Sequence, residues 1–223
     1  LPSYFLADTN GPDYEGAYIA QENFVNDGQI NWNRIYDANI TNNLSNLNAA
    51  YVLYEDRVDD TQLTINSAYN REINENIKIT SSVNYRNLVS DNFAEISDML
   101  GGYSYSNIDS FDNLDYNLLS PNSIVSDGDK FKYHYKMNAE EISLFSMINF
   151  SYNKLEFYLA GDLTNTTYQR DGIFENEANA GNSSGKGEEI KFDGYGVKAG
   201  ITYKFSGKHI LDFNSAYLQK APS

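Results

Sequence analysis

Apolar and polar positions alternate with a period of two near the end of the chain. Between residues 195 and 205 every odd-numbered position is apolar or aromatic: Tyr195, Val197, Ala199, Ile201, Tyr203 and Phe205. After a polar connection at 206–209, the pattern resumes at Leu211, Phe213 and Tyr217. Side chains of a strand point alternately to opposite faces. The pattern therefore predicts a hairpin with one apolar and one polar face.

The same alternation predicts further strands earlier in the chain. Residues 61–73 alternate around Leu63 and Ile65, and residues 155–168 alternate around Leu159 and Leu163. We expect three strands between 48 and 89, the first closed by the charged run 55–60, and four strands between 143 and 220. The other segments are predicted as loops: 1–46 with a helical turn near 30–36, 90–142 with a short helix at 93–100, and 170–190.

The connections between these strands differ in length from one end to the other. Those at 74–76, 153–154 and 206–209 are short and fall at one end. Of the three connections at the other end, the loops 90–142 and 170–190 are long and the charged run 55–60 is short. Outer-membrane barrels have short periplasmic turns and long extracellular loops. Aromatic residues near the short turns suit a membrane interface: Tyr152, Tyr203 and Phe205.

The predicted fold class is therefore all-β, with antiparallel up-and-down strands forming part of a large transmembrane β-barrel. The loops 1–46, 90–142 and 170–190 are expected on the extracellular side. The alternative is a soluble or surface-anchored β-sandwich that acts as a glycan-binding or adhesin module. The two differ in what covers the apolar face, lipid or a second sheet.

Composition narrows the choice of partners. The chain of 223 residues has 31 acidic and 16 basic side chains and a formal net charge of −15, which disfavours nucleic acid as a partner. It has no cysteine, which excludes disulfides and thiolate chemistry. The chain has no run of about 18 apolar residues, so no transmembrane helix is predicted. A barrel stays possible on these grounds, because its lipid face uses every second residue.

No catalytic constellation or cofactor site is predicted, and we do not expect an enzyme. His134 and His209 lie far apart, in a predicted loop and a predicted turn, and are expected to be solvated. Loop carboxylates offer hard oxygen ligands for Ca²⁺, but their spacing differs from that of a calcium loop, and acidic loop solvation is the alternative. These weak calcium candidates are Asp109, Asp112, Asp115, Asp127 and Asp129.

Two further sets of residues are candidates for binding. Aromatic rings beside Asn and Asp suit sugars or peptides, although packing between loops is the commoner role for any one such ring. The loop candidates are Trp32, Tyr36, Tyr103, Tyr105 and Tyr116. If the apolar face meets lipid, the alternate, polar residues of each strand face the barrel lumen, where salt bridges are expected. The lumen-facing candidates are Glu156, Asp162, Lys198 and Lys204.

Short segments spread over most of the chain resemble the barrel of a TonB-dependent outer-membrane receptor, most of all the Oar-like type with a carboxypeptidase-regulatory-like N-terminal domain. The segments that carry the resemblance are Tyr51–Arg57, Val83–Leu88, Asp98–Gly102, Gly128–Tyr133, Gly207–His209 and Ala216–Pro222.

The resemblance implies a location in the outer membrane of a Gram-negative-type bacterium. Such receptors hold a plug domain inside a barrel of about 22 strands and import scarce extracellular ligands with energy from the TonB complex. The expected partners are outer-membrane lipid, the plug domain of the same full-length chain, the TonB complex through parts not present here, and an unknown extracellular ligand. About a third of such a barrel is expected here, and an open set of strands would leave its edges exposed.

Overall fold

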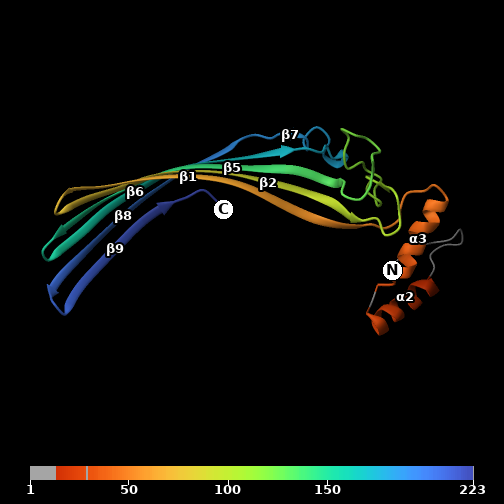
Figure 1. Ribbon diagram of the computed structural model, residues 1–223, viewed down its shortest axis with the longest axis horizontal. Coiled ribbons are helices and arrows are strands. Elements are labelled where there is room, and N and C mark those ends of the chain that lie inside the picture. Colours follow the sequence, from red (N-terminus) through yellow and green to blue (C-terminus); the bar gives the residue numbers. More distant parts are fainter. Residues whose placement is uncertain (1–13, 29, 223) are drawn as a thin grey trace. The chain divides into compact units, whose positions relative to one another are not determined.

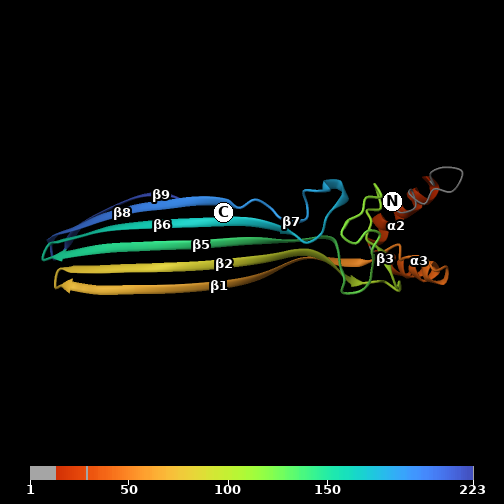
Figure 2. The same cartoon turned by 90° about the horizontal axis from the view of Figure 1, so that it is seen from above.

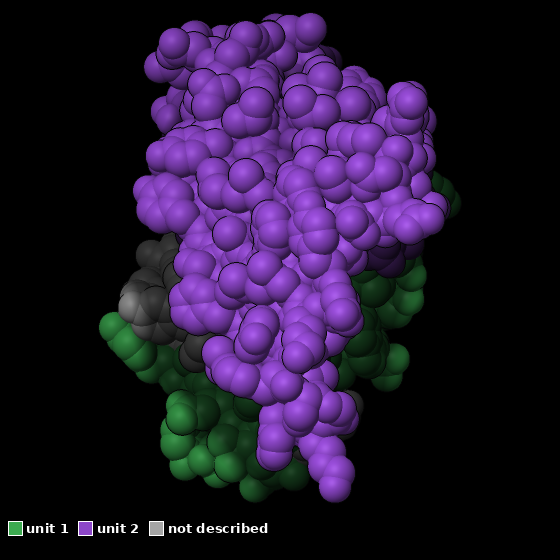
Figure 3. All heavy atoms as spheres, turned by 90° about the vertical axis from the view of Figure 1, so that its left-hand side faces the viewer, with its two compact units in different colours: residues 1–53, 98–105 green, residues 54–97, 106–223 purple. Residues whose placement is uncertain are grey.

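The computed structural model describes residues 14–28 and 30–222. The chain divides into two compact units, coloured separately in Figure 3. One unit contains residues 1–53 and 98–105, and the other contains residues 54–97 and 106–223. We describe each unit by itself.

The first unit contains two helices, α2 (Tyr14–Asp27) and α3 (Trp32–Leu44). The sequence predicted only a helical turn near 30–36 inside an irregular loop, of which residues 1–13 lie outside the described part. Asn31 caps α3, because its side chain accepts a hydrogen bond from Arg34 N. Asn39 is fully buried and hydrogen-bonds the backbone of residues 50–51 and 99–100. These buried hydrogen bonds join α3 to the two segments.

The second unit is a sheet of long antiparallel strands in up-and-down order (Figures 1 and 2). Its long strands lie side by side in the order β1-β2-β5-β6-β8-β9, and the short β7 pairs with β6. Their bounds are β1 Leu53–Asn74, β2 Ile77–Asp98, β5 Lys130–Tyr152, β6 Leu155–Gly172, β7 Gly185–Lys186, β8 Ile190–Ser206 and β9 His209–Gln219. The predicted fold class is confirmed as antiparallel up-and-down strands in a sheet that is not closed.

Small elements complete the connections at the loop end. Two short strands, β3 (Tyr105–Ser106) and β4 (Ile124–Val125), form a separate two-stranded sheet. A 3₁₀ turn, η1, covers Glu177–Asn179. No helix among the described residues is both long and apolar enough to cross a membrane.

Several strands are longer than the sequence predicted. The structure has two strands, β1 and β2, where three were expected between 48 and 89, because β1 runs through the charged segment 55–60 without a turn. β2 continues to Asp98 through the expected helix at 93–100, and β5 begins at Lys130, so the long loop covers only 99–129. The four strands expected between 143 and 220 are present as β5, β6, β8 and β9.

The tight turns of the sheet gather at one end, as the sequence predicted. They lie at 75–76, 153–154 and 207–208, and the connections 106–129 and 173–189 lie at the opposite end of the sheet (Figures 1 and 2). Buried apolar side chains of this unit concentrate at the loop end. They are Phe93, Ala94, Ile96, Val125 and Phe131, with Ala160 the exception nearer the turns.

Candidate functional site

One face of the sheet is apolar and exposed over five neighbouring strands. In one row across it Val83 pairs with Leu144, Leu144 pairs with Leu163, and Leu163 pairs with Tyr195. Leu163 is 60 % exposed. We call this the apolar face; its large members on β2 to β9 are Ile77, Ile79, Val83, Ile142, Leu144, Ile148, Phe150, Phe157, Leu159, Leu163, Tyr195, Val197, Ile201, Leu211, Phe213 and Tyr217.

β1 extends this face. Asn66 donates to Asn84 and Thr80 donates to Asn70, so even-numbered residues of β1 and β2 share the opposite, polar face. The odd-numbered residues of β1 therefore lie on the apolar side. Among them, Leu63 and Ile65 are each more than half exposed.

The apolar face has limits along the strands. It begins at the row of Tyr152, Leu155 and Tyr203 and ends at the row of Tyr85 and Ile142, where β6 and β8 turn polar. The ten residue-to-residue steps from Tyr152 to Ile142 along β5 span about 33 Å at about 3.3 Å per step.

Aromatic rings mark both limits of this band. Phe150 stacks on Phe157 with ring centroids 4.4 Å apart, and Tyr203 meets Phe205 edge-on at 4.7 Å near the turns. Towards the loops, the rings of Tyr195 and Tyr217 lie 6.0 Å apart. Aromatic residues at both edges of an apolar band are typical of membrane interfaces.

The three hairpins are staggered along the sheet. Ile77 follows the first turn and pairs with Phe150, and β5 continues two residues further to Tyr152 before its own turn. Leu155 pairs with Tyr203, and β8 continues three residues further to Ser206. An offset of two to three residues over two strands gives a slope of about 35–45°, with about 3.3 Å per residue and about 4.8 Å between strands. If the strands are tilted by this angle, the three tight turns lie at the same level.

The opposite, polar face carries the four residues that the sequence placed towards a lumen. The register puts Glu156, Asp162, Lys198 and Lys204 on this face of β6 and β8. Lys204 forms an ion pair with Glu156, whereas Asp162 lies opposite Gly196 and Lys198 opposite Ala160. Further hydrogen bonds on the same face join Thr202 to Asp212 and Tyr158 to Asn214.

The five aromatic loop candidates are divided between the two units. Trp32, Tyr36, Tyr103 and Tyr105 belong to the first unit, and Tyr116 belongs to the second. Tyr103 is 83 % exposed, whereas the ring of Tyr36 lies against Gly101. Tyr116 donates its hydroxyl to Asp109 over 2.7 Å, which favours the structural explanation for this residue.

Four of the five candidate calcium ligands act as loop caps. Asp109 accepts from Phe111 N, Asp112 from Leu114 N, and Asp129 from Ser126 N. Asp115 is buried, and its carboxylate accepts the backbone N–H groups of residues 117 and 122. In the described part of the chain, no three acidic or histidine side chains are placed to hold a metal ion.

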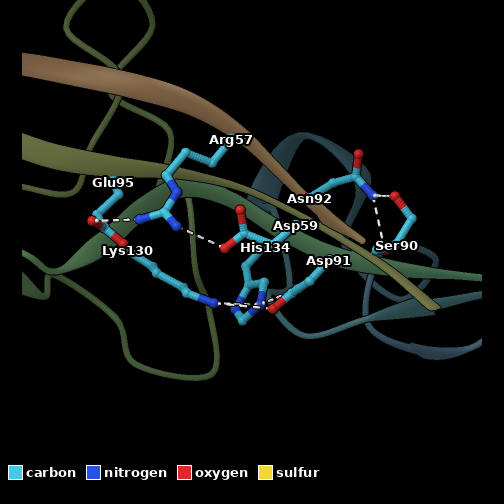
Figure 4. A network of polar contacts seen from close by, with 8 residues as sticks. All are labelled: Arg57, Asp59, Ser90, Asp91, Asn92, Glu95, Lys130 and His134. Atoms are coloured by element: carbon cyan, nitrogen blue, oxygen red, sulfur yellow. Dashed lines mark hydrogen bonds and ion pairs between the residues drawn. The ribbon is translucent and has the colours of Figure 1, made fainter. Parts of the chain in front are cut away.

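A charged network lies on the apolar-face side of the sheet, beyond the apolar band at the loop end. Figure 4 shows Arg57 between Glu95 and Asp59, at 3.1 and 2.8 Å. Beside them, Asp91 accepts from Lys130 at 3.2 Å and from His134 Nε2 at 2.8 Å (Figure 4).

Aromatic rings pack against this network. Lys130 Nζ lies 3.6 Å from the centroid of the Phe93 ring, and the guanidinium of Arg57 lies over the same ring. His134 contacts Phe93 and Phe174 edge-on. The expectation that His134 is solvated is wrong, because only 12 % of its side chain is exposed.

This environment lowers the pKa values of His134 and Asp91. Burial lowers the pKa of His134 from its ordinary value, and the hydrogen bond to Asp91 opposes that shift only in part. Burial opposes ionisation of Asp91, but the hydrogen bonds from Lys130 and His134 prevail and lower its pKa. Near neutral pH the network therefore contains a neutral imidazole and a carboxylate.

A second cluster lies on the polar face at the loop end. Tyr133 donates its hydroxyl to Asp56 over 2.9 Å, and Lys132 donates to the Tyr54 hydroxyl over 3.0 Å. The rings of Tyr133 and Tyr135 lie 6.0 Å apart, and the Arg170 guanidinium lies 5.0 Å from the Tyr135 ring. We call this the tyrosine cluster; its members are Tyr54, Asp56, Lys132, Tyr133, Tyr135 and Arg170.

Two members of the cluster have raised pKa values. Partial burial and the hydrogen bond to Asp56 raise the pKa of Tyr133 to about 12. The hydrogen bond with Tyr54 raises the pKa of Lys132. At neutral pH the phenol therefore stays a donor and the amine stays charged.

Sequence analysis missed this cluster because it placed residues 90–142 in a loop. A strand signal was present there, since Phe131, Tyr133, Tyr135 and Met137 share one parity and alternate with basic residues: Lys130, Lys132, His134 and Lys136.

Comparison of the chain with protein-family models, with curated proteins and with solved structures found no match. The function is therefore argued from the two faces of the sheet and the clusters at its loop end.

Proposed function

We propose that this chain is part of the wall of a β-barrel in a bacterial outer membrane, within a receptor that imports an extracellular ligand. The observation that carries the proposal is the continuous apolar face, exposed on five neighbouring strands and bounded by aromatic rings. Burying one large aliphatic side chain contributes about 1.5–3 kcal/mol. A face with this many exposed residues therefore needs an apolar phase.

The dimensions of the apolar face suit lipid. Its length along the strands is about 33 Å, and a tilt of about 40° projects this onto about 25 Å, the height of the lipid-facing band of outer-membrane barrels. The staggered hairpins give a similar slope independently, since they end at one level when the strands tilt. In this arrangement the short turns face the periplasm and the connections 106–129 and 173–189 face the outside.

The polar face supports the lumen side of the proposal. It carries the ion pair Lys204–Glu156 and hydrogen-bonded polar pairs in the same rows as the apolar band. In lipid the remaining hydrogen-bonding capacity of these groups would be unsatisfied, whereas a plug domain or water in a lumen would satisfy it. The free edges of β1 and β9 would pair with further strands of the full-length barrel.

The finer proposal is a TonB-dependent receptor. It rests on the resemblance of short segments and on the segregation of turns and loops. In this proposal the partners are outer-membrane lipid, a plug domain of the same chain, and the TonB complex that supplies energy for import.

Site-directed spin labels in the full-length protein, purified with outer-membrane vesicles, test the proposal. Labels at Leu159 and Val197 should collide with oxygen dissolved in lipid and stay protected from a water-soluble nickel complex. A matched label at Asp162, on the opposite face of β6, should show the reverse preference. If Leu159 and Val197 are inaccessible to both reagents, protein covers the apolar face and the β-sandwich module replaces the receptor.

A further inference from the structure

The tyrosine cluster combines ring faces with hydrogen-bonding groups of both kinds. Tyr54 is 42 % exposed, and Tyr133 and Tyr135 are partly exposed. The cluster joins three strands, since Tyr54 and Asp56 come from β1, the other two tyrosines from β5, and Arg170 from β6.

Its internal hydrogen bonds hold the rings in place. Asp56 receives the Tyr133 hydroxyl through Oδ1, and Lys132 approaches the Tyr54 hydroxyl at 3.0 Å. Arg170 is anchored by a 2.8 Å hydrogen bond from Nη1 to Ser183 O. A site whose side chains are already ordered loses less conformational entropy when a ligand binds.

The groups that remain can both donate and accept. An ammonium has three donors and a guanidinium has five, so Lys132 and Arg170 can donate beyond their bonds to Tyr54 and Ser183. The Tyr133 oxygen can accept while its hydroxyl donates to Asp56, and the Asp56 carboxylate has a second oxygen.

We propose that the tyrosine cluster binds a neutral carbohydrate, with sugar rings over Tyr133 and Tyr135 and sugar hydroxyls bonded to Lys132, Asp56 and Arg170. A hydroxyl both donates and accepts, which matches the mixed set of groups, and the C–H face of a sugar suits an aromatic ring. An anionic ligand fits less well, because Asp56 lies within the cluster and the chain carries a net charge of −15. This assignment rests on the proposed function, in which the polar face lines the opening through which a ligand enters.

Binding of defined oligosaccharides to the full-length detergent-solubilised protein tests the assignment by titration calorimetry. The probes are the neutral hexasaccharides cellohexaose, maltohexaose, xylohexaose and chitohexaose, with hexagalacturonate as the acidic comparison. We expect at least one neutral hexasaccharide to bind, and Tyr135→Ala to weaken that binding by about tenfold. Tyr133→Phe keeps the ring but loses the hydrogen bond to Asp56, so it should weaken binding less than Tyr135→Ala.

Tyr158→Ala is the matched control, because Tyr158 lies on the same face but in the half of β6 near the turns. It should leave binding within twofold. Binding of hexagalacturonate alone, no binding of any probe, or equal losses in Tyr135→Ala and Tyr158→Ala would overturn the assignment. If the carbohydrate assignment fails but spin labels still show lipid contact at Leu159, the membrane proposal stands. If the labels show no lipid contact, the proposed function itself is contradicted.

Discussion

The turn half and the loop half of the long strands bury their apolar side chains in different ways. In the turn half, between the tight turns and the row of Tyr85 and Ile142, one face is apolar and exposed. In the loop half, Phe93, Ile96 and Phe131 are at most 4 % exposed. The same strands therefore cross from a region without protein cover to a region with a protein core.

At the loop end, the apolar residues of the strands are covered by loops and by the aliphatic parts of charged side chains. Residues 173 and 174 donate their backbone N–H groups to His134 O, which brings Phe174 against the imidazole. Long side chains such as Lys130 lie over Phe93 and keep their charged ends in the polar network. Alternation in the sequence therefore shows which side chains lie on an apolar face. Whether protein covers that face depends on the topology of the strands and loops.

The largest expected effect separates a protein core from a lipid-facing surface. Phe93→Ala should lower the free energy of unfolding by about 3–5 kcal/mol, because the ring is 2 % exposed and a cavity would remain. In the proposed membrane location, Leu159→Ala should cost about 2 kcal/mol, since lipid would fill the space and only the transfer free energy would be lost. Guanidinium titration of the full-length protein in vesicles measures both. Equal losses at the two positions would mean that Leu159 also sits in a protein core.

A charge in the apolar band gives the next largest effect. Leu159→Arg should cost about 2–4 kcal/mol, as expected for arginine near the middle of a bilayer on the lipid face of a barrel. Thr164→Arg, on the polar face of the same strand, should cost less than about 1 kcal/mol. The same titration compares them, and a larger loss for Thr164→Arg than for Leu159→Arg would reverse the assignment of the faces.

The sequence predicted the turn half well because only one face there is apolar. The parity of Leu159, Leu163, Val197 and Ile201 is enough to define those strands, their faces and their turns. The residues expected to face a lumen, Glu156 and Lys204 among them, follow from the same parity.

The loop half was harder to predict for a physical reason. In β1 the period of two is lost in the charged residues 55–60, so the sequence predicts a turn there although β1 runs through them. The segment 93–100, with its polar start and the glycines that follow it, predicted a helix, but backbone pairing of β2 with β5 continues to Glu95. The clusters around His134 and Tyr133 depend on strand pairing between residues far apart in sequence, which no local pattern reports.

A smaller effect is expected where the polar face is packed closely. A Cβ atom on Gly200 would lie 2.3 Å from Tyr158 Cε1 and 2.2 Å from Asn214 Oδ1. Gly200→Ala should displace Tyr158, break its hydrogen bond to Asn214 and cost about 1–3 kcal/mol. Gly207→Ala is the control, because a Cβ there meets nothing within 4 Å. Thermal unfolding of both variants decides this, and a Gly200→Ala protein as stable as the control would show that the two side chains move aside freely.

The smallest effect is a pH dependence confined to the loop half. The pKa of His134 is lowered in the folded protein from its ordinary value of 6.5, so the unfolded chain takes up a proton first as pH falls. The stability due to the neutral imidazole is therefore complete above pH 6.5 and decreases as pH falls through the lowered pKa. Hydrogen exchange at residues 173–174, whose amides bond to His134 O, should accelerate in this range relative to the intrinsic rate.

His134→Gln should remove most of that acceleration, because glutamine does not titrate there. Amides of β8 and β9 serve as the internal reference, since their strands lie away from His134 in the order of the sheet. The His134 imidazole faces Asp91, Lys130 and Lys136. Because the pKa of Asp91 is lowered, its protonation would affect stability only at more acidic pH. Acceleration that persists in His134→Gln, or that spreads equally to β8 and β9, would assign the pH dependence to the whole sheet rather than to the covered loop half.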